Sequence, residues 1–459
     1  MPAGADQQAN RDEILIQITR ARQDAIEAYQ QIRTASHGYR LVVGRDFQPR
    51  SVPEVQAWLA DQNALLLEYF IGQNASYLFV VPPSGEPRAV ELTISQELAE
   101  QHQLAAGPLT RSSLSALVGR GQEGLWESLA SPEASTKLTS RLNLLWQLLI
   151  PERERPALLS DQVPRLIVVP DGPLGLIPIE TWVVEPGETP KYFLDVGPVV
   201  TYAPSATALL GLAQLPTRPT PKDLKPVLTI ADAVYSAVSA QPSSRPADGL
   251  SDQAGYQRAG GRLTPLPFTG VESKWLSDVF QKQSVAVGQL IQKNATEAAL
   301  RYNVPGRRVV HIACHGLMDA ASGNLFGALA LTPGKTSSLD DGFLTLAEIY
   351  ELDLQGCELA ILSACQTNFG PQQTSEGTWS LSRGFLVAGS RRVVASNWLV
   401  DDEAAASLMS YFAGGLATSW NESDLSCAKR LHAAKRWCRQ QSKWTHPYYW
   451  GTFVLVGPN

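Results

Sequence analysis

Two apolar stretches, RVVHIACHG (Arg308–Gly316) and CELAILSACQT (Cys357–Thr367), decide which class of fold the chain can adopt. Each contains a run of apolar residues long enough for one strand, and each ends in turn-forming residues. Such continuous apolar character is typical of a strand that is covered on both faces, as in parallel sheets. The two stretches therefore predict neighbouring parallel strands in an α/β domain.

Strand and helix patterns alternate around these two stretches. Further strands are expected over 227–232, 392–398 and 452–457, and helices over 270–281, 296–302, 346–351, 378–388, 403–416 and 423–439. Because parallel strands are joined by helical crossovers, this alternation predicts an α/β fold with a largely parallel sheet.

The earlier part of the chain has a different pattern. ALLLEYFI (Ala64–Ile71) and ASYLFVV (Ala75–Val81) predict a hairpin with a third strand near Arg88–Thr93, helices follow over 95–105 and 138–149, and another strand begins at Arg165. A Pro-rich joint at 216–226 then separates a first half, 51–215, from a second half, 227–459.

Two further segments lie outside these halves or interrupt them. Residues 1–50 carry one long helical pattern over 11–36, which either packs on its own domain or acts as a docking helix or a remnant of a helical repeat array. Residues 236–262 are rich in Ser, Pro, Gly and Ala, which is typical of a long surface loop.

The composition excludes several classes of protein. The chain has 459 residues, of which 44% are hydrophobic, so a sizeable core is available and wholesale disorder is excluded. Its net charge of −6 argues against a nucleic-acid or anionic-membrane binder that works through bulk charge. The polar N-terminus and the 5 cysteines predict a cytoplasmic protein with free thiols and no membrane association.

The carboxyl ends of the two central strands carry the strongest chemical signal. His315 and Cys365 each follow such a strand, and active sites of parallel α/β sheets lie at this edge. A cysteine beside a histidine can form a nucleophile–base dyad, in which the thiolate attacks and the imidazole later protonates the leaving group. Their separation of 50 residues is the spacing quoted for caspases.

Neighbouring residues extend this interpretation. Gly316 lacks a Cβ, so its N–H can approach a scissile carbonyl and form an oxyanion hole with the amide of Cys365. His311 lies within its strand and is expected to satisfy a hydrogen bond in the core. The remaining cysteines are interpreted as small buried residues. Neither a phosphate-binding loop nor a metal-ligand spacing is present, so no cofactor and no metal are expected.

Several motifs together resemble one family, the CHAT peptidases, which are caspase-like cysteine proteases related to separase. The resemblance covers about residues 55–459, in the order of the family's motifs. Its motifs are LLEYFIG, IVVPDGPLGLIPIE (Ile167–Glu180), TYAPSATALL (Thr201–Leu210), HIACHG (His311–Gly316), LSACQT (Leu362–Thr367), EGTWSLSRGFLVAGSRRVVASNW (Glu376–Trp398) and HPYYWGTFVLVG (His446–Gly457).

This resemblance implies a caspase-like three-layer fold, duplicated as a degenerate pseudo-caspase first half and an active second half. It implies peptide-bond hydrolysis with His315 as general base and Cys365 as nucleophile. Relatives often carry helical repeats that receive an activating protein partner. Asn397 stands where relatives commonly have an apolar residue, and we attach no consequence to it from the sequence.

A basic residue before the cut is expected from the segment Trp398–Asp402. Separase-like relatives have a similar Trp-then-acidic segment, which makes Asp402, with Asp401 and Trp398, the candidate substrate-binding residues. Asp401 and Asp402 also stand where a helix N-cap belongs, so one of them can cap while the other faces the pocket.

The function predicted is that of an intracellular cysteine endopeptidase acting on a protein substrate under the control of an activator. The loop 366–376 is expected to become ordered when an activator or substrate binds. Two alternatives stay open, a non-catalytic interaction scaffold with a caspase-like shell and a thiol hydrolase for small substrates.

Overall fold

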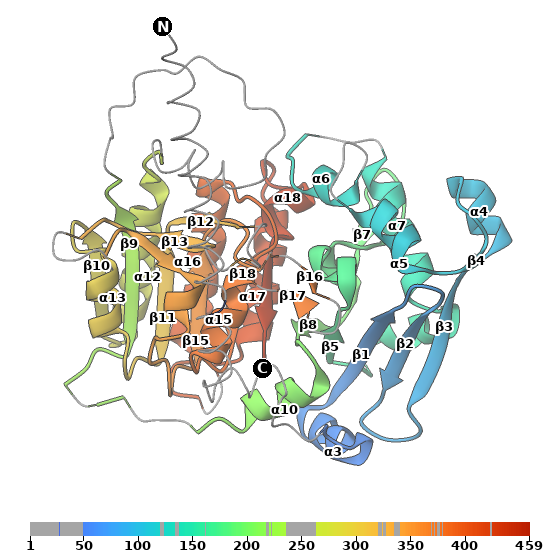
Figure 1. The fold of residues 1–459 in the computed structure, drawn as a ribbon, viewed down its shortest axis with the longest axis horizontal. Coiled ribbons are helices and arrows are strands. Elements are labelled where there is room, and N and C mark those ends of the chain that lie inside the picture. Colours follow the sequence, from blue (N-terminus) through green and yellow to red (C-terminus); the bar gives the residue numbers. More distant parts are fainter. Residues whose placement is uncertain are drawn as a thin grey trace, which may run out of the picture.

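The fold of the chain is drawn in Figure 1, from a computed structural model. The described residues are 49–119, 124–133, 137–160, 162–216, 220–221, 223–235, 263–319, 324, 327–334, 340–368, 370, 372–373, 377–378, 380–422 and 425–459, together with Glu27. Apart from Glu27, the expected helix over 11–36 lies outside the described residues, and so does the expected loop over 236–262.

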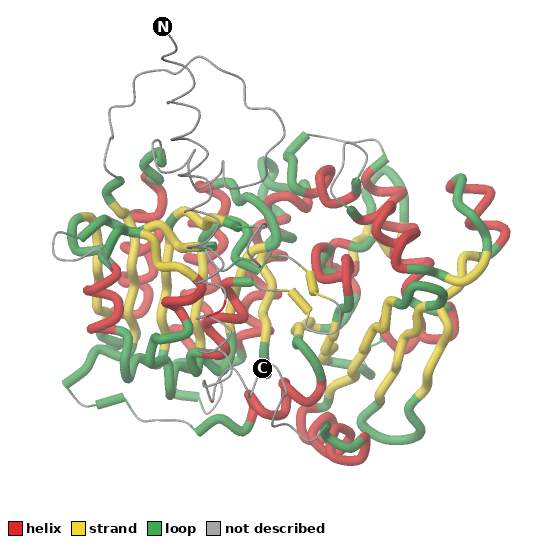
Figure 2. Tube along the Cα trace, in the orientation of Figure 1, coloured by secondary structure: helices red, strands yellow, loops and turns green. Residues whose placement is uncertain are grey.

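A large sheet runs through the molecule. Among the described residues, twelve strands pair in the order β10-β9-β11-β15-β18-β19-β8-β5-β1-β2-β3-β4. Figure 2 shows its strands side by side across both halves of the chain. The strands β10, β9, β11, β15 and β18 are parallel to one another, and so are β8, β5 and β1. The expectation of an α/β fold with a mostly parallel sheet is therefore confirmed.

The second half alternates strands and helices as its sequence predicts. Its strands in the large sheet are β9 (Val227–Ala233), β10 (Val287–Gln292), β11 (Val309–Ala313), β15 (Leu359–Ser363), β18 (Val393–Ser396) and β19 (Phe453–Val456), and its helices are α12 (Pro267–Gln281), α13 (Glu297–Asn303), α14 (Leu346–Ile349), α15 (Leu381–Val387), α16 (Asp402–Thr418), α17 (Cys427–Arg439) and α18 (Pro447–Trp450). Helices α12, α16 and α17 pack in series, and every residue of β11 and β15 is buried.

The second half also contains short strands that lie outside the large sheet. A sheet of three consists of β12 (His315–Leu317), β13 (Ala328–Ala330) and β14 (Phe343–Thr345), and a pair consists of β16 (Gln372–Gln373) and β17 (Gly377–Thr378). Since β12 begins at His315, this small sheet starts at the carboxyl end of β11.

The first half contains the expected hairpin and third strand. Its elements are α3 (Val52–Gln62), β1 (Ala64–Ile71), β2 (Ser76–Val81), β3 (Arg88–Ile94), α4 (Gln96–His102), β4 (Gly107–Pro108), α5 (Arg111–Val118), α6 (Leu125–Leu129), α7 (Leu138–Leu149), η1 (Glu152–Glu154), α8 (Arg155–Leu158), β5 (Arg165–Val169), η2 (Gly172–Leu176), η3 (Ile179–Thr181), β6 (Val183–Glu185), β7 (Lys191–Tyr192), α9 (Phe193–Val196), β8 (Val199–Tyr202) and α10 (Ala206–Ala213), where η marks a 3-10 helix.

The two halves share one sheet and one core. Strand β19 meets β8 where Gly457 N donates to Tyr202 O at 2.8 Å. Beside this junction the buried ammonium of Lys435 lies 2.5 Å from Glu180 Oε1, and a buried charge is tolerated when it is paired in this way. The predicted boundaries at 50, 215 and 226, and the idea that the first half is a degenerate copy of the second, stay predictions.

The helices were compared with what a membrane span requires in length and hydropathy. Among the described residues, no helix is both long and apolar enough to cross a membrane.

Candidate active site

The register of the two central strands brings His315 and Cys365 to one edge of the sheet. In the parallel pair β11–β15, Ala313 stands opposite Ser363. His315 and Cys365 each lie two residues beyond this aligned pair. The two predicted site residues therefore leave neighbouring strands at the same height, as the sequence analysis expected.

Gly316 makes the closest approach between these two chain segments. A Cβ built on Gly316 would lie 2.0 Å from the carbonyl oxygen of Cys365 and 3.2 Å from its amide nitrogen. Only a residue without a side chain fits against this backbone. No described residue accepts a hydrogen bond from the Cys365 N–H. That the amides of Gly316 and Cys365 form an oxyanion hole stays a prediction.

The imidazole of His315 is held by the backbone of the segment that leads into α12. Its Nε2 lies 2.8 Å from the carbonyl oxygen of Thr264, which can only accept a hydrogen bond. The proton of a neutral imidazole is therefore on Nε2, and Nδ1 keeps its lone pair. The ring also packs against Tyr235, with 5.2 Å between the ring centroids. This arrangement leaves Nδ1 as the basic atom.

The Cys365 thiol is in a protonated resting state at neutral pH. Burial is the largest effect and raises its pKa, the charge of Asp402 raises the pKa as well, and a hydrogen bond from the Val400 backbone lowers it. Among the described residues, no hydrogen bond joins this thiol to His315. The resting geometry therefore holds the two groups on one edge of the sheet without forming an activated ion pair.

Asp401 and Asp402 have different environments. Asp401 is the N-cap of α16, and its Oδ1 accepts a hydrogen bond from Ala404 N at 2.9 Å. Asp402 instead accepts one from Phe268 N at 3.2 Å, at the start of α12. Burial raises the pKa of Asp402 most, Glu272 and Asp401 raise it further, and the Phe268 bond and His315 lower it.

These two environments divide the roles that the sequence left open. Asp401 is committed to the helix N-terminus, as one of the two was expected to be. Asp402 lies within electrostatic reach of both His315 and Cys365 and is only partly buried, so its carboxylate remains near the candidate site.

The expectation that Trp398 contacts substrate needs correction. Its side chain is 0% exposed, and its indole Nε1 donates to the carbonyl of Tyr448 at 3.0 Å. An aromatic residue at a strand end fills the core here because the last helical turn, α18, covers it. Trp398 therefore supports the segment that carries Asp401 and Asp402 and does not reach a substrate.

The other cysteines are buried, as their sequence positions suggested. Cys314 is 3% exposed and its thiol donates to the carbonyl of His315 at 3.4 Å. Burial raises the pKa of Cys357 to about 11 and that of Cys438 to about 12. Among the described residues, no three His, Cys, Asp or Glu side chains gather in a way that could hold a metal ion.

A buried polar network beneath the site was missed by the sequence analysis. Glu272 on α12 accepts a hydrogen bond from Ser363 Oγ at 3.0 Å and lies 2.7 Å from Nε2 of His311. Nδ1 of His311 lies 2.8 Å from Thr229 Oγ1 on β9. The expected core hydrogen bond of His311 is therefore present. The sequence signal for its partner Glu272 is that this acidic residue lies on the side of α12 that faces the core.

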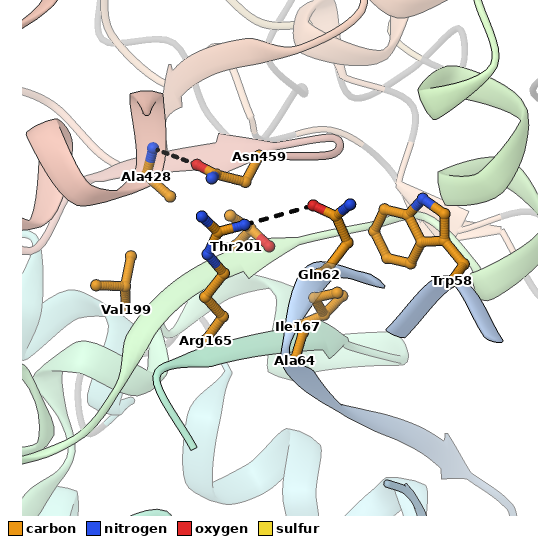
Figure 3. Close-up of a pocket in the computed structure, with 9 residues that line it drawn as sticks. All are labelled: Trp58, Gln62, Ala64, Arg165, Ile167, Val199, Thr201, Ala428 and Asn459. Atoms are coloured by element: carbon orange, nitrogen blue, oxygen red, sulfur yellow. Dashed lines mark hydrogen bonds between the residues drawn. The ribbon is translucent and has the colours of Figure 1, made fainter. Parts of the chain in front are cut away.

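A small pocket lies apart from these residues. It is bordered by the first residues of β1, β5 and β8. Figure 3 shows Arg165 in it, with Nη1 donating to Gln62 Oε1 at 3.4 Å, and Ala428 N donating to Asn459 Oδ1 at 3.0 Å. None of the candidate site residues lines this pocket.

Known proteins resemble this chain at several levels. Tetratricopeptide repeat protein 28 of Homo sapiens is 28% identical over 119 residues, which are 26% of this chain and only 4% of that protein. The Arg-specific cysteine proteinase gingipain R of Porphyromonas gingivalis has a TM-score of 0.39 at 11% identity, over 72% of this chain and 69% of that chain.

The chain is also similar to a second solved structure and matches a family model. Separase in the separase–securin complex of Saccharomyces cerevisiae has a TM-score of 0.47 at 12% identity, over 90% of this chain and 32% of that chain. The model of the CHAT domain matches residues 139–458, from α7 across the Pro-rich joint to the last strand. Because this match covers well over half of the 459 residues, the chain belongs to the CHAT-domain family.

Proposed function

We propose that the chain is a cysteine endopeptidase, with Cys365 as nucleophile and His315 as general base. The observation that carries the proposal is the close approach of Gly316 to the Cys365 backbone. Because His315 directly precedes Gly316, this approach supports a place for His315 and Cys365 at one edge of the sheet. The CHAT domain supports a cysteine protease in coarse outline.

The chemistry follows from the groups at this edge. Nδ1 of His315 takes the proton of the Cys365 thiol, and the thiolate attacks the carbonyl carbon of the scissile peptide bond. The imidazolium then protonates the leaving amine, and water hydrolyses the thioester with His315 again as base. Developing negative charge on the carbonyl oxygen is stabilised by the N–H of Cys365, with that of Gly316.

Asp402 supplies the preference for Arg or Lys before the cut. A cationic substrate side chain needs a carboxylate at the end of its pocket, because an unpaired buried charge is costly. Asp402 raises the pKa of the Cys365 thiol, and His315 lowers the pKa of Asp402, which makes this carboxylate the candidate for the role. Asp401 caps α16 and is not available for this role.

Activity depends on an activating step, which we assign to a protein partner. The resting thiol has a raised pKa and is hydrogen-bonded by the Val400 backbone. Catalysis therefore needs a small movement that brings the thiol to Nδ1 of His315 and lowers its pKa.

The raised thiol pKa would also fit the alternative, a non-catalytic interaction scaffold. The test is incubation of the full chain with a mixed peptide library, with and without a lysate fraction as activator, and identification of cuts by mass spectrometry. Wild type and Cys357→Ala are expected to cut, and Cys365→Ala and His315→Ala are not. Absence of Cys365-dependent cuts in every condition would leave the scaffold as the function.

A further inference from the structure

Asn397, which follows β18, is a buried polar residue with partners in both halves of the chain. Its side chain is 2% exposed. Its Nδ2 donates to the carbonyls of Gly175 at 3.2 Å and Leu176 at 3.3 Å, both in η2 of the first half. Its Oδ1 accepts from Asn368 Nδ2 at 2.8 Å, in the segment that follows Cys365.

The backbone of Asn397 is tied in the same way. Its carbonyl accepts a hydrogen bond from the indole Nε1 of Trp126 on α6, at 3.4 Å. Its N–H donates to Thr452 O at 3.0 Å. A buried asparagine is costly unless its groups are paired, and here both ends of the amide have partners. Asn397 thus connects the first half to the nucleophile's side of the sheet.

The segment after Cys365 is bound along the end of β18 by several contacts. Asn368 N donates to Ser396 O at 2.8 Å, and Ser396 N donates to Thr367 Oγ1 at 2.9 Å. Asn368 Oδ1 in turn accepts from Ser382 Oγ at 2.8 Å, at the start of α15. Between this segment and Cys365 lies Gln366, whose φ of 54° is in the left-handed region. The position of Cys365 therefore depends on how firmly Thr367 and Asn368 are held.

The turn η2 is itself anchored in the first half. Asp171, which precedes it, accepts a hydrogen bond from Ile71 N at 2.7 Å and pairs with Arg111 at 3.4 Å. The segment after the nucleophile also reaches η2 a second time, because β17 packs against it. Figure 1 shows β16 and β17 at the junction of the two halves.

We propose that Asn397 is a positioning residue through which η2 of the first half holds the turn that carries Cys365. The expected effect on peptide cleavage rests on the proposed function, whereas the expected effect on the position of Cys365 does not. The first half then acts as part of the catalytic support, and its turn η2 determines where the thiol stands relative to His315. Asn397 touches neither the thiol nor a substrate.

The test compares the full-length wild type with Asn397→Leu, Asn368→Leu and the double variant. Each single change is expected to lower kcat for a cleaved peptide at least tenfold with less than a twofold change in KM. The double variant is expected to be no slower than the slower single one, because both changes break the same link. Asn397→Asp, which keeps the acceptor for Asn368 but loses the Nδ2 donor to the carbonyls of Gly175 and Leu176, is expected to be as slow as Asn397→Leu.

A second readout does not need peptidase activity. The rate of Cys365 alkylation by iodoacetamide, followed by mass spectrometry, is expected to rise at least threefold in both single variants because the turn is released. The matched control is Asn143→Leu, which removes a buried bond from Nδ2 to Val183 O in the first half, at 2.8 Å. It is expected to lower the melting temperature without changing the alkylation rate.

The outcomes separate this inference from the proposed function. If wild type cuts peptides and the Asn397 variants lose only as much melting temperature as Asn143→Leu, with unchanged kcat and alkylation, the positioning role is overturned and the peptidase stands. If no variant, wild type included, cuts peptides, the proposed function fails, and the alkylation rates alone decide the role of Asn397.

Discussion

Gly316 and Cys365 are so close that a Cβ on residue 316 would stand 2.0 Å from the Cys365 carbonyl oxygen. Contacts of this kind between backbones cannot be relieved by rotating a side chain. The carboxyl ends of β11 and β15 are therefore held at a separation that only glycine permits. The same contact keeps the segment with His315 beside the nucleophile.

Gly316→Ala is expected to abolish peptidase activity, because the backbone of Cys365 must move away from its place beside His315. The measurement is kcat/KM on a cleaved peptide together with the melting temperature. Gly414→Ala on α16 is the matched control, since a Cβ there meets nothing within 4 Å and alanine favours helix by up to about 1 kcal/mol. Full activity of Gly316→Ala would show that the contact is not needed for catalysis.

Glu272→Leu is expected to lower the free energy of unfolding by about 3 to 5 kcal/mol, because it leaves the buried His311 and Ser363 without their common partner. Denaturant unfolding measures this loss. Asp278→Ala removes an exposed ion pair with Lys274 from the same helix, and its loss is expected to stay below about 1 kcal/mol. Equal losses for the two variants would contradict a structural role for the Glu272–His311 pair.

The sequence predicts the alternating strands and helices of the second half because hydrophobic periodicity is a local property. It also predicts which edge of the sheet carries His315 and Cys365, since the carboxyl ends of parallel strands share an edge. The sequence does not predict the partners of Asn397, because Gly175 and Leu176 are more than two hundred residues away in the chain. Trp398 was misinterpreted for a similar reason. Its burial depends on α18, which follows much later.

Asp402→Asn is expected to reduce cleavage after Arg or Lys well over tenfold relative to cleavage after uncharged residues. Asparagine keeps an oxygen that can accept from Phe268 N, so the melting temperature is expected to change little. Asp401→Ala is the counterpart. It removes the cap of α16 and is expected to cost about 1 kcal/mol of stability with unchanged substrate preference.

Peptide-library profiles and thermal melts of these two variants decide the assignment. A large loss of stability in Asp402→Asn, with the same residues before the cut as in wild type, would give Asp402 a structural role and leave the specificity pocket without a carboxylate.

The pH dependence of Cys365 alkylation provides a final prediction. Only the thiolate reacts, and burial together with the charge of Asp402 raises the pKa of this thiol. In the resting wild type, the midpoint of the alkylation rate is therefore expected above the range of an ordinary cysteine. Asp402→Asn removes a nearby negative charge that disfavours the thiolate, so the midpoint is expected to move to lower pH and alkylation at neutral pH to become faster.

Asp401→Asn is the control for this experiment, because asparagine is also a good N-cap and the charge of Asp401 does not contribute to the raised pKa of Cys365. Its midpoint is expected to equal that of wild type. A midpoint in Asp402→Asn that stays in place or moves to higher pH would mean that Asp402 does not face the thiol. In that case Asp402 would neither influence the nucleophile nor lie in a pocket for basic residues, because both roles require Asp402 to be close to Cys365.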